Sequence, residues 1–206
     1  MSTLDDYHIP SEHLKMLNRM LKVVTTVLKH NNISYWADGG TLLGAIRNKG
    51  QIPWDDDCDI GVMSEDITKI EKIAHHFISF GYAVQKVNDD LWKVYIPLKE
   101  TWTKTEHNDI GTPTLDIFAW QVKDTMVRLN DPNARREYPN CYHKINNLFP
   151  LKEYTFNDHS IMGPSNPIPY LNRMYSDWQT KAVVDIREYD DNLVTKKVGT
   201  VSFALA

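Results

Sequence analysis

Hydrophobic residues recur with two different periods in the first 120 residues, and the two periods alternate along the chain. A spacing of three to four residues, starting at Ser11 and ending near residue 30, predicts an amphipathic helix. The same spacing returns in residues 64–80, where Gly81 is expected to end a second helix. Between them, apolar residues alternate strictly in 57–62, which predicts a strand. Helices that alternate with strands predict an α/β (α+β) fold.

Shorter patterns complete this outline. Strands are expected at 33–37, 82–87, 91–98 and 114–121, and a short helix at 41–46. Prolines interrupt the chain after residue 121, one late helix is expected at 170–179, and residues 181–206 carry no readable pattern. The length favours a single domain over 1–206, with a core at about 11–121, an extension at about 122–180 and a tail at 181–206.

Composition excludes several classes of protein. Lys and Arg number 23 against 27 Asp and Glu, a net charge of −4, so the chain lacks the positive excess that non-specific nucleic-acid binding needs. Cys58 and Cys141 are too few for a disulfide scaffold or a four-cysteine zinc site. Since neither a signal-peptide pattern nor a run of 18 apolar residues occurs, we expect a cytoplasmic protein with no membrane span.

Residues 39–61 hold the densest pattern of chemically active side chains. Asp57 and Asp59 are expected side by side on one face of a strand, with Cys58 on the other face. Two close carboxylates repel each other unless a cation lies between them, so the pair predicts a Mg²⁺ or Mn²⁺ site. Asp116, on another predicted strand, is expected to complete the metal site or to act as a base.

The residues before these acids suit a phosphate group. Gly39 and Gly40 have no Cβ, so their backbone N–H groups can approach an anion closely, and a helix starting at Thr41 would direct its positive end there. Arg47 is expected to neutralise phosphate, and Trp54 to form a wall of the site. The glycine spacing matches neither the P-loop nor the dinucleotide-binding motif.

Two other interpretations of the acidic run compete with a catalytic metal site. Acidic runs are often solvated loops, although the strict alternation of apolar residues disfavours that here. The acids at 55, 57 and 59 also fit the first three ligand positions of an EF-hand calcium loop. However, Ile60 occupies its glycine position and Pro53 interrupts the incoming helix.

The stretches WADGGTLLGAIR at 36–47 and IPWDDDCDI at 52–60 resemble the signature of the LicD family, which includes phosphocholine transferases of bacterial surface glycans and fukutin-related protein. The similarity extends to LDIF at 115–118 and to parts of 148–151 and 167–178. It implies a nucleotidyltransferase fold of the polymerase beta type, with the metal acids at Asp57, Asp59 and Asp116, Asp55 as a further candidate ligand, and the phosphate element at Gly39, Gly40 and Thr41. It also implies metal-dependent transfer of a phospho-substituent from a CDP-activated donor to a glycan hydroxyl.

Two departures from the family pattern concern the specificity for the acceptor. Ser176 stands where the family usually has glycine, and Ala-Trp-Gln at 119–121 replaces the commoner Pro-Leu-Asp. Two rival functions also remain open at this stage. One is transfer of a nucleoside monophosphate, and the other is a noncatalytic metal-binding or glycan-associated protein with the same fold.

Overall fold

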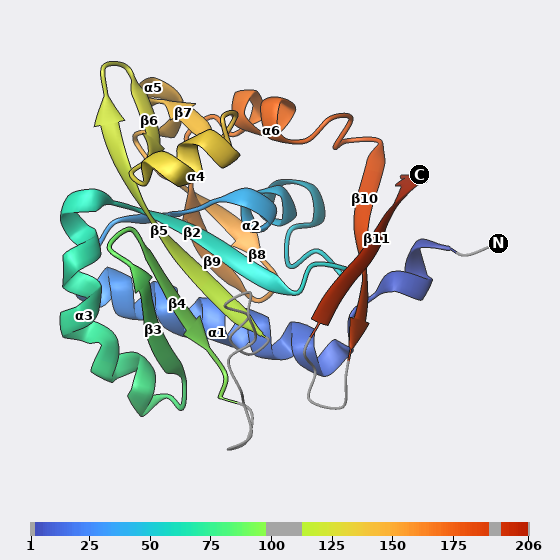
Figure 1. Cartoon of the computed structure of the whole chain (residues 1–206), viewed down its shortest axis with the longest axis horizontal. Coiled ribbons are helices and arrows are strands. Elements are labelled where there is room, and N and C mark those ends of the chain that lie inside the picture. Colours follow the sequence, from blue (N-terminus) through green and yellow to red (C-terminus); the bar gives the residue numbers. More distant parts are fainter. Residues whose placement is uncertain (1–2, 98–112, 190–194, 206) are drawn as a thin grey trace.

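A mixed sheet forms the centre of the molecule (Figure 1). The computed structural model describes residues 3–97, 113–189 and 195–205. The sheet runs in the order β1 (Tyr35–Ala37), β2 (Asp57–Met63), β5 (Thr114–Lys123), β4 (Leu91–Tyr95) and β3 (Ala83–Asn88). The strands β6 (Met126–Leu129) and β7 (Tyr142–Lys144) extend it beside β5. The strands β2 and β5 are parallel, and the other neighbours are antiparallel, so the predicted α/β class is confirmed.

Two long helices pack against this sheet, and both were predicted from their apolar spacing. Helix α1 (Ser11–His30) buries one stripe that includes Leu17, Leu21 and Leu28. Helix α3 (Ser64–Ser79) buries its own stripe, and both helices contact β2 and β5 (Figure 1). No helix in the described ranges is long and apolar enough to cross a membrane.

Because fully buried residues alternate with others along the first part of β2, its two acids share one face of the strand. Cys58, Ile60 and Val62 are fully buried, whereas Asp57 and Asp59 are partly exposed on the opposite side. Cys58 donates a hydrogen bond to Gln51, and burial raises the pKa of its thiol, which keeps it protonated. Cys58 is therefore the small core residue that the pattern predicts.

The short helix before β2 begins earlier than expected. Helix α2 (Gly39–Leu43) starts two residues before the predicted 41–46 and continues into a π-helical turn, η2 (Gly44–Asn48). Lys49 ends it with a left-handed backbone and donates from Nζ to the carbonyl oxygen of Ile46. Because α2 contacts β2, the glycine pair lies beside the acidic strand.

The C-terminal part follows the sequence patterns least. It contains α4 (Pro132–Glu137), α5 (Ile145–Leu148), the hairpin β8 (Lys152–Phe156) and β9 (His159–Gly163), and α6 (Ile168–Met174). The helix predicted at 170–179 is wrong in its second half, since Asp177 has a positive φ of 53° and its carbonyl accepts from Thr180 and Lys181 in a turn. The tail forms an antiparallel hairpin of β10 (Lys181–Tyr189) and β11 (Thr195–Ala204).

The predicted strands of the sheet otherwise agree with the structure to within a few residues. Strand β4 ends at Tyr95, short of the predicted end, and residue 98 lies outside the described residues. A short 3₁₀ turn, η1 (Leu4–Tyr7), packs near the tail hairpin through a ring contact of Tyr7 with Phe203. The two ends of the described chain therefore meet on the side of the molecule that carries the hairpin (Figure 1).

Candidate metal and phosphate site

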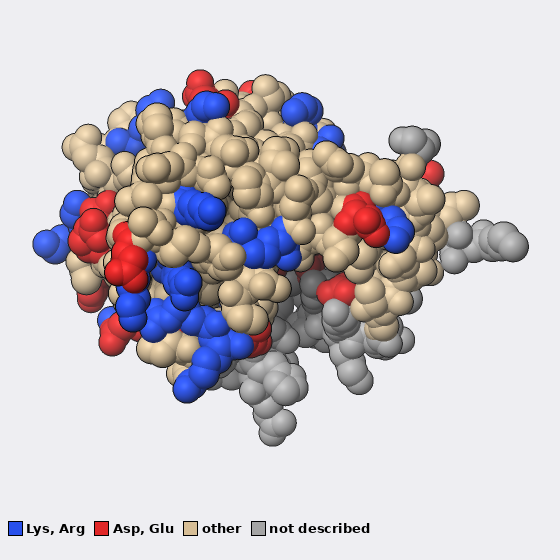
Figure 2. All heavy atoms as spheres, turned by 90° about the horizontal axis from the view of Figure 1, so that it is seen from above, with Lys and Arg blue, Asp and Glu red and all other residues tan. Residues whose placement is uncertain are grey.

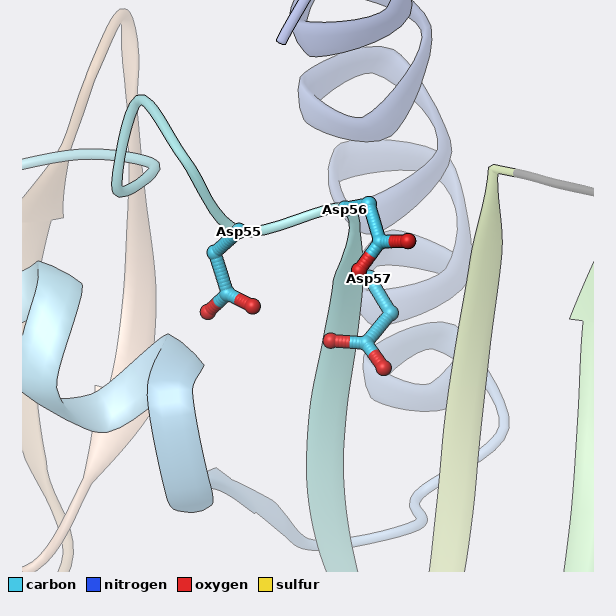
Figure 3. Close-up of side chains that lie close together, drawn as sticks. All are labelled: Asp55, Asp56 and Asp57. Carbon is cyan, nitrogen blue, oxygen red and sulfur yellow. The ribbon is translucent and has the colours of Figure 1, made fainter. Parts of the chain in front are cut away.

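Three consecutive acids gather at the start of β2. Asp55, Asp56 and Asp57 each offer a carboxylate oxygen, and these oxygens lie within 4.8 Å of one another. Figure 3 shows Asp55 on the loop that enters the strand and Asp57 at its first residue, with their carboxylates turned toward the space between them. Asp56 is buried, and its carbonyl oxygen is 3.0 Å from the His13 ring on α1. An all-carboxylate group of this kind suits a hard divalent cation.

Asp59 and Asp116 lie next to each other on the parallel strands β2 and β5, where the register pairs them directly. The pKa of the Asp59 carboxyl is raised well above its ordinary value, first by desolvation and then by the charges of Asp57, Asp116, Asp55 and Asp38. The predicted acids therefore act on one another electrostatically. The three-acid group at 55–57 contains Asp57 but neither Asp59 nor Asp116.

Lys93 is a site residue that the sequence reasoning missed. Its ammonium donates to both oxygens of Asp116, at 2.9 and 2.7 Å, and both side chains are mostly buried. Desolvation raises the pKa of Asp116, and the charge and hydrogen bonds of Lys93 oppose that rise. The signal lies in the alternation of 91–95, where Trp92 and Val94 are buried and Lys93 faces the other side. The register that places it opposite Asp116 appears only in the folded sheet.

The glycine pair directly contacts the acids. Gly39 has a positive φ of 49°, and a Cβ added there would lie 2.6 Å from an oxygen of Asp59. A Cβ on Gly40 would overlap an oxygen of Asp55. Thr41 is buried, and its hydroxyl oxygen accepts from the backbone N–H of Asp59, which fastens α2 to β2. The structure thus brings the predicted phosphate element and the predicted metal acids to one place.

A cavity of about 560 Å³ opens beside these residues. Gly40, Asp55, Asp57 and Asp59 line one end of it, whereas Asp116 is not among its lining residues. Among the other lining residues are Arg47, Trp54, Tyr175, Trp178, Lys181, Val183 and Asp185. Trp54 is a wall of the site, as expected. The volume falls in the range typical of small-molecule sites.

Arg47 joins the phosphate element to the C-terminal part of the chain. Its Nη1 donates to the carbonyl oxygens of Trp178 and Lys181, at 3.2 and 3.4 Å, and its guanidinium lies over the ring of Trp54, 5.5 Å from the centroid. These contacts hold the positively charged guanidinium of Arg47 along the cavity wall. Desolvation lowers the pKa of Arg47, but its ordinary value is so high that the group stays charged.

The sequence patterns also did not predict a buried pair, Asp38 and His143, next to the glycine pair. Asp38 immediately precedes Gly39, and one of its oxygens lies 3.7 Å from the His143 ring, with both side chains almost fully buried. The His143 ring stacks on Tyr170 of α6 at 4.2 Å between centroids. Sequence spacing assigns no role to His107, His143 or His159, and His107 lies outside the described residues. The contact of His143 with Asp38 arises only through the packing of β7 beside the site.

Comparison with known proteins identifies the family. A model of the LicD/FKTN/FKRP nucleotidyltransferase domain matches residues 32–166, which include both the glycine pair and all the candidate acids. The chain belongs to this family. The fold class and the resemblance predicted from the sequence are therefore confirmed.

The chain is also similar in sequence to individual proteins. An uncharacterized protein of Rickettsia typhi is 36% identical over 179 residues, which are 86% of this chain and 51% of that protein. Human ribitol 5-phosphate transferase FKRP is 40% identical over 60 residues, 29% of this chain and 12% of that one. The lipopolysaccharide cholinephosphotransferase LicD of Haemophilus influenzae is 71% identical over 28 residues, 14% of this chain and 11% of that one.

A lincomycin-bound crystal structure of the lincosamide antibiotic adenylyltransferase LnuA covers 78% of this chain and 86% of its own, at 18% identity and a TM-score of 0.44. The chain spans only about half the length of the Rickettsia typhi relative.

Proposed function

We propose that this LicD-family chain transfers a phospho-substituent, phosphocholine or a polyol phosphate, from a CDP-activated donor to a glycan hydroxyl. The observation that carries the proposal is the close approach of Gly39 to Asp59 and of Gly40 to Asp55, beside a cavity that Gly40, Asp55, Asp57 and Asp59 line. Backbone suited to phosphate and carboxylates suited to a divalent cation thereby meet at a single point. Family membership and the activities by which the human and Haemophilus relatives are named support the same chemistry.

The acids fit a hard divalent cation. Asp57, Asp59 and Asp116, with Asp55 beside them, are the residues proposed to hold Mg²⁺ or Mn²⁺. The raised pKa of Asp59 supports this choice, since a cation would relieve the repulsion that its acidic neighbours create. When bound, the ion would neutralise negative charge that develops on the phosphate oxygens.

Other groups of the chain would bind and orient the donor. The backbone of Gly39 and Gly40, with Thr41 after them, is proposed to lie against the donor phosphates through its N–H groups, with the cation between these phosphates and the carboxylates that approach the two glycines. Arg47 is proposed to supply a charge-assisted contact to phosphate, and its hydrogen bonds to two C-terminal carbonyls hold it on the cavity wall.

The proposed step forms one P–O bond and breaks another. The acceptor oxygen attacks the donor phosphorus that carries the choline or polyol, and the bond from that phosphorus to the bridging oxygen breaks, so CMP leaves with the bridging oxygen. The acceptor proton is proposed to pass to Asp116. In the metal-free protein burial raises the pKa of this carboxyl, and the charge and hydrogen bonds of Lys93 oppose the rise.

The experiment offers the purified chain CDP-choline, CDP-ribitol or CDP-glycerol with Mn²⁺ and a glycan acceptor, and measures release of CMP. Asp57→Asn and Asp116→Asn should each lower the rate about 100-fold or more, since each removes charge from the reacting centre. Asp124→Asn, in the exposed turn between β5 and β6, is the matched control. Near-normal turnover in either site variant contradicts the assignment. Release of phosphocholine or of the polyol phosphate, with transfer of CMP to the acceptor, would indicate nucleotidyl transfer instead.

A further inference from the structure

Asp38 and His143 form a buried polar pair next to the glycine pair. One oxygen of the Asp38 carboxylate lies 3.7 Å from Nε2 of His143, and the two side chains are 5% and 0% exposed. Neither that oxygen nor either ring nitrogen has a hydrogen-bond partner among the described residues. The view from above shows the main body over β7 and α6 as a closed surface, with a recess toward the hairpin end (Figure 2). Because buried polar groups without partners destabilise a fold, the pair requires a physical reason.

Asp38 occupies the position from which an aspartate ordinarily caps a helix. It precedes Gly39, the first residue of α2, and its backbone is extended, with φ −127° and ψ 174°. An aspartate in this position usually accepts a hydrogen bond from a backbone N–H group two or three residues later. The Asp38 side chain accepts none from α2, all of which the structure describes. Its carboxylate is therefore turned away from the N–H groups that it would ordinarily bind.

The ring of His143 and the backbone of Asp38 are both held in place. The ring stacks on Tyr170, with 4.2 Å between centroids and an interplanar angle of 11°, and it is tilted against Trp120 at 5.5 Å. The backbone N–H of Asp38 donates to the carbonyl oxygen of Asp59 at 3.1 Å. With both fixed, rotation of the Asp38 side chain decides where its carboxylate points.

A carboxylate turned toward α2 would interfere with phosphate binding. Rotation about the Cα–Cβ bond of Asp38 would bring it to the N–H groups of Gly40 and Thr41, where it would compete with phosphate and repel it. The carboxylates of Asp55 and Asp59 also lie near the glycines, but they line the cavity, where a cation is proposed to join them to phosphate. Asp38 is not among the described residues that line the cavity, so it is not placed to bind the same cation.

We propose that His143 is a positioning residue, which holds the Asp38 carboxylate away from α2 and so keeps the N–H groups of the glycine pair open to the donor phosphates. With the hydrogen on Nε2, the ring presents a donor to Asp38, and burial of both groups strengthens their attraction. His143 acts through Asp38 and touches no substrate. This inference rests on the proposed function, because it takes the glycine pair to be the phosphate-binding element.

Two variants that change opposite properties of residue 143 test this role. Isothermal titration of the full chain with CDP in the presence of Mg²⁺ measures the affinity. His143→Phe keeps a ring to stack on Tyr170 but has no donor for Asp38. The affinity should fall about tenfold, the worth of a helix cap that the phosphate must displace. His143→Gln keeps a donor but loses the stack, so it should bind CDP as wild type does and melt at a lower temperature than His143→Phe. A residue that served packing alone would give the opposite order of affinities.

Removal of the competing carboxylate should restore binding. Asp38→Ala added to His143→Phe leaves no side chain that can cap α2, so the double variant should bind CDP nearly as tightly as wild type. Damage elsewhere in the fold would persist in the double variant, whereas coupling between the two positions would not be additive. His159→Phe is the matched control and should leave the CDP affinity unchanged. His159 is also mostly buried beside a carboxylate, that of Asp158 at 3.4 Å, and it lies on β9 outside the described lining of the cavity.

Several results would overturn the inference. Unchanged CDP affinity in His143→Phe, weaker binding by His143→Gln than by His143→Phe, a double variant as weak as His143→Phe, or an equal loss in His159→Phe would each remove it. CDP binding by wild type would leave the proposed function standing in all four cases. Failure of wild type to bind CDP removes both. Thermal melting shows that each variant is folded, and His143→Leu replaces His143→Phe if the latter does not fold.

Discussion

The ammonium of Lys93 on β4 contacts both carboxylate oxygens of Asp116 on β5, and the antiparallel register places the two residues directly opposite each other. On the other side of Asp116, the parallel register places Asp59. Asp116 is therefore paired with a positive charge inside the sheet, whereas Asp59 faces the negatively charged acids of its own strand and loop. The site combines one paired carboxylate with a group of mutually repelling ones.

Replacement of Lys93 by Met should destabilise the protein strongly. It would leave the carboxylate of Asp116 in a mostly buried position without its partner, and breaking a pair of this kind typically costs about 3–5 kcal/mol. Urea denaturation measures the loss. Adding Asp116→Asn to the same chain should recover part of it, because the amide carries no charge. A Lys93→Met variant as stable as wild type would show that the pair contributes nothing.

The stability of the metal-free protein should fall as pH rises. The pKa of Asp59 is raised in the folded state by desolvation and by its acidic neighbours, so the folded protein holds this proton to higher pH than the unfolded chain. The contribution is fully present below the ordinary aspartate pKa and is lost as pH rises through the raised value. Thermal melting in EDTA over a pH series should show this fall, and Asp59→Asn should flatten it. An unchanged slope in the variant would assign the pH dependence to other groups.

Divalent metal should reverse that loss only in chains that keep the Asp59 carboxylate. Mn²⁺ is proposed to bind the folded acids, so it should raise the melting temperature of wild type, and the rise should grow with the logarithm of the Mn²⁺ concentration above the dissociation constant. Asp59→Asn should melt at the same temperature as wild type or higher in EDTA, and should lose the metal-induced rise. The control Asp124→Asn should keep the full rise. Strong destabilisation of Asp59→Asn in EDTA would indicate a structural role for this carboxylate.

Local patterns were enough to predict the two long helices, the acidic strand and the glycine pair. The apolar stripes of α1 and α3 and the alternation of β2 are periodic over many residues, so they fix the type of element without tertiary information. The close approach of Gly39 to Asp59 follows from the same segment, because α2 and β2 are neighbours in both sequence and space. The family resemblance rested mainly on the segments that hold the glycine pair and the acidic strand.

The remaining features depend on contacts between distant parts of the chain. Lys93 is an ordinary strand residue until the register places it opposite Asp116, and His143 meets Asp38 only through packing of β7. Strand β10 gave no clear pattern because Val183, an exposed apolar residue that lines the cavity, interrupts the alternation of the buried Ala182 and Val184 with polar residues. The late helix was predicted too long because the positive φ of Asp177 gives no periodic signal.

A matched pair of glycine substitutions can separate backbone strain from contact with the acids. Gly39 and Gly81 both have positive φ values, 49° and 88°, so Gly→Ala at either position should cost about 1 kcal/mol in backbone strain. Only at Gly39 would the new Cβ also meet Asp59, since nothing lies within 4 Å of the Cβ position at Gly81. Gly39→Ala should therefore lose the Mn²⁺-induced rise in melting temperature as well as stability, whereas Gly81→Ala should lose stability alone. Urea denaturation and melting with and without Mn²⁺ measure the two effects. Equal metal responses in the two variants would show that the acids tolerate a side chain at position 39, and that the glycine there serves only the backbone.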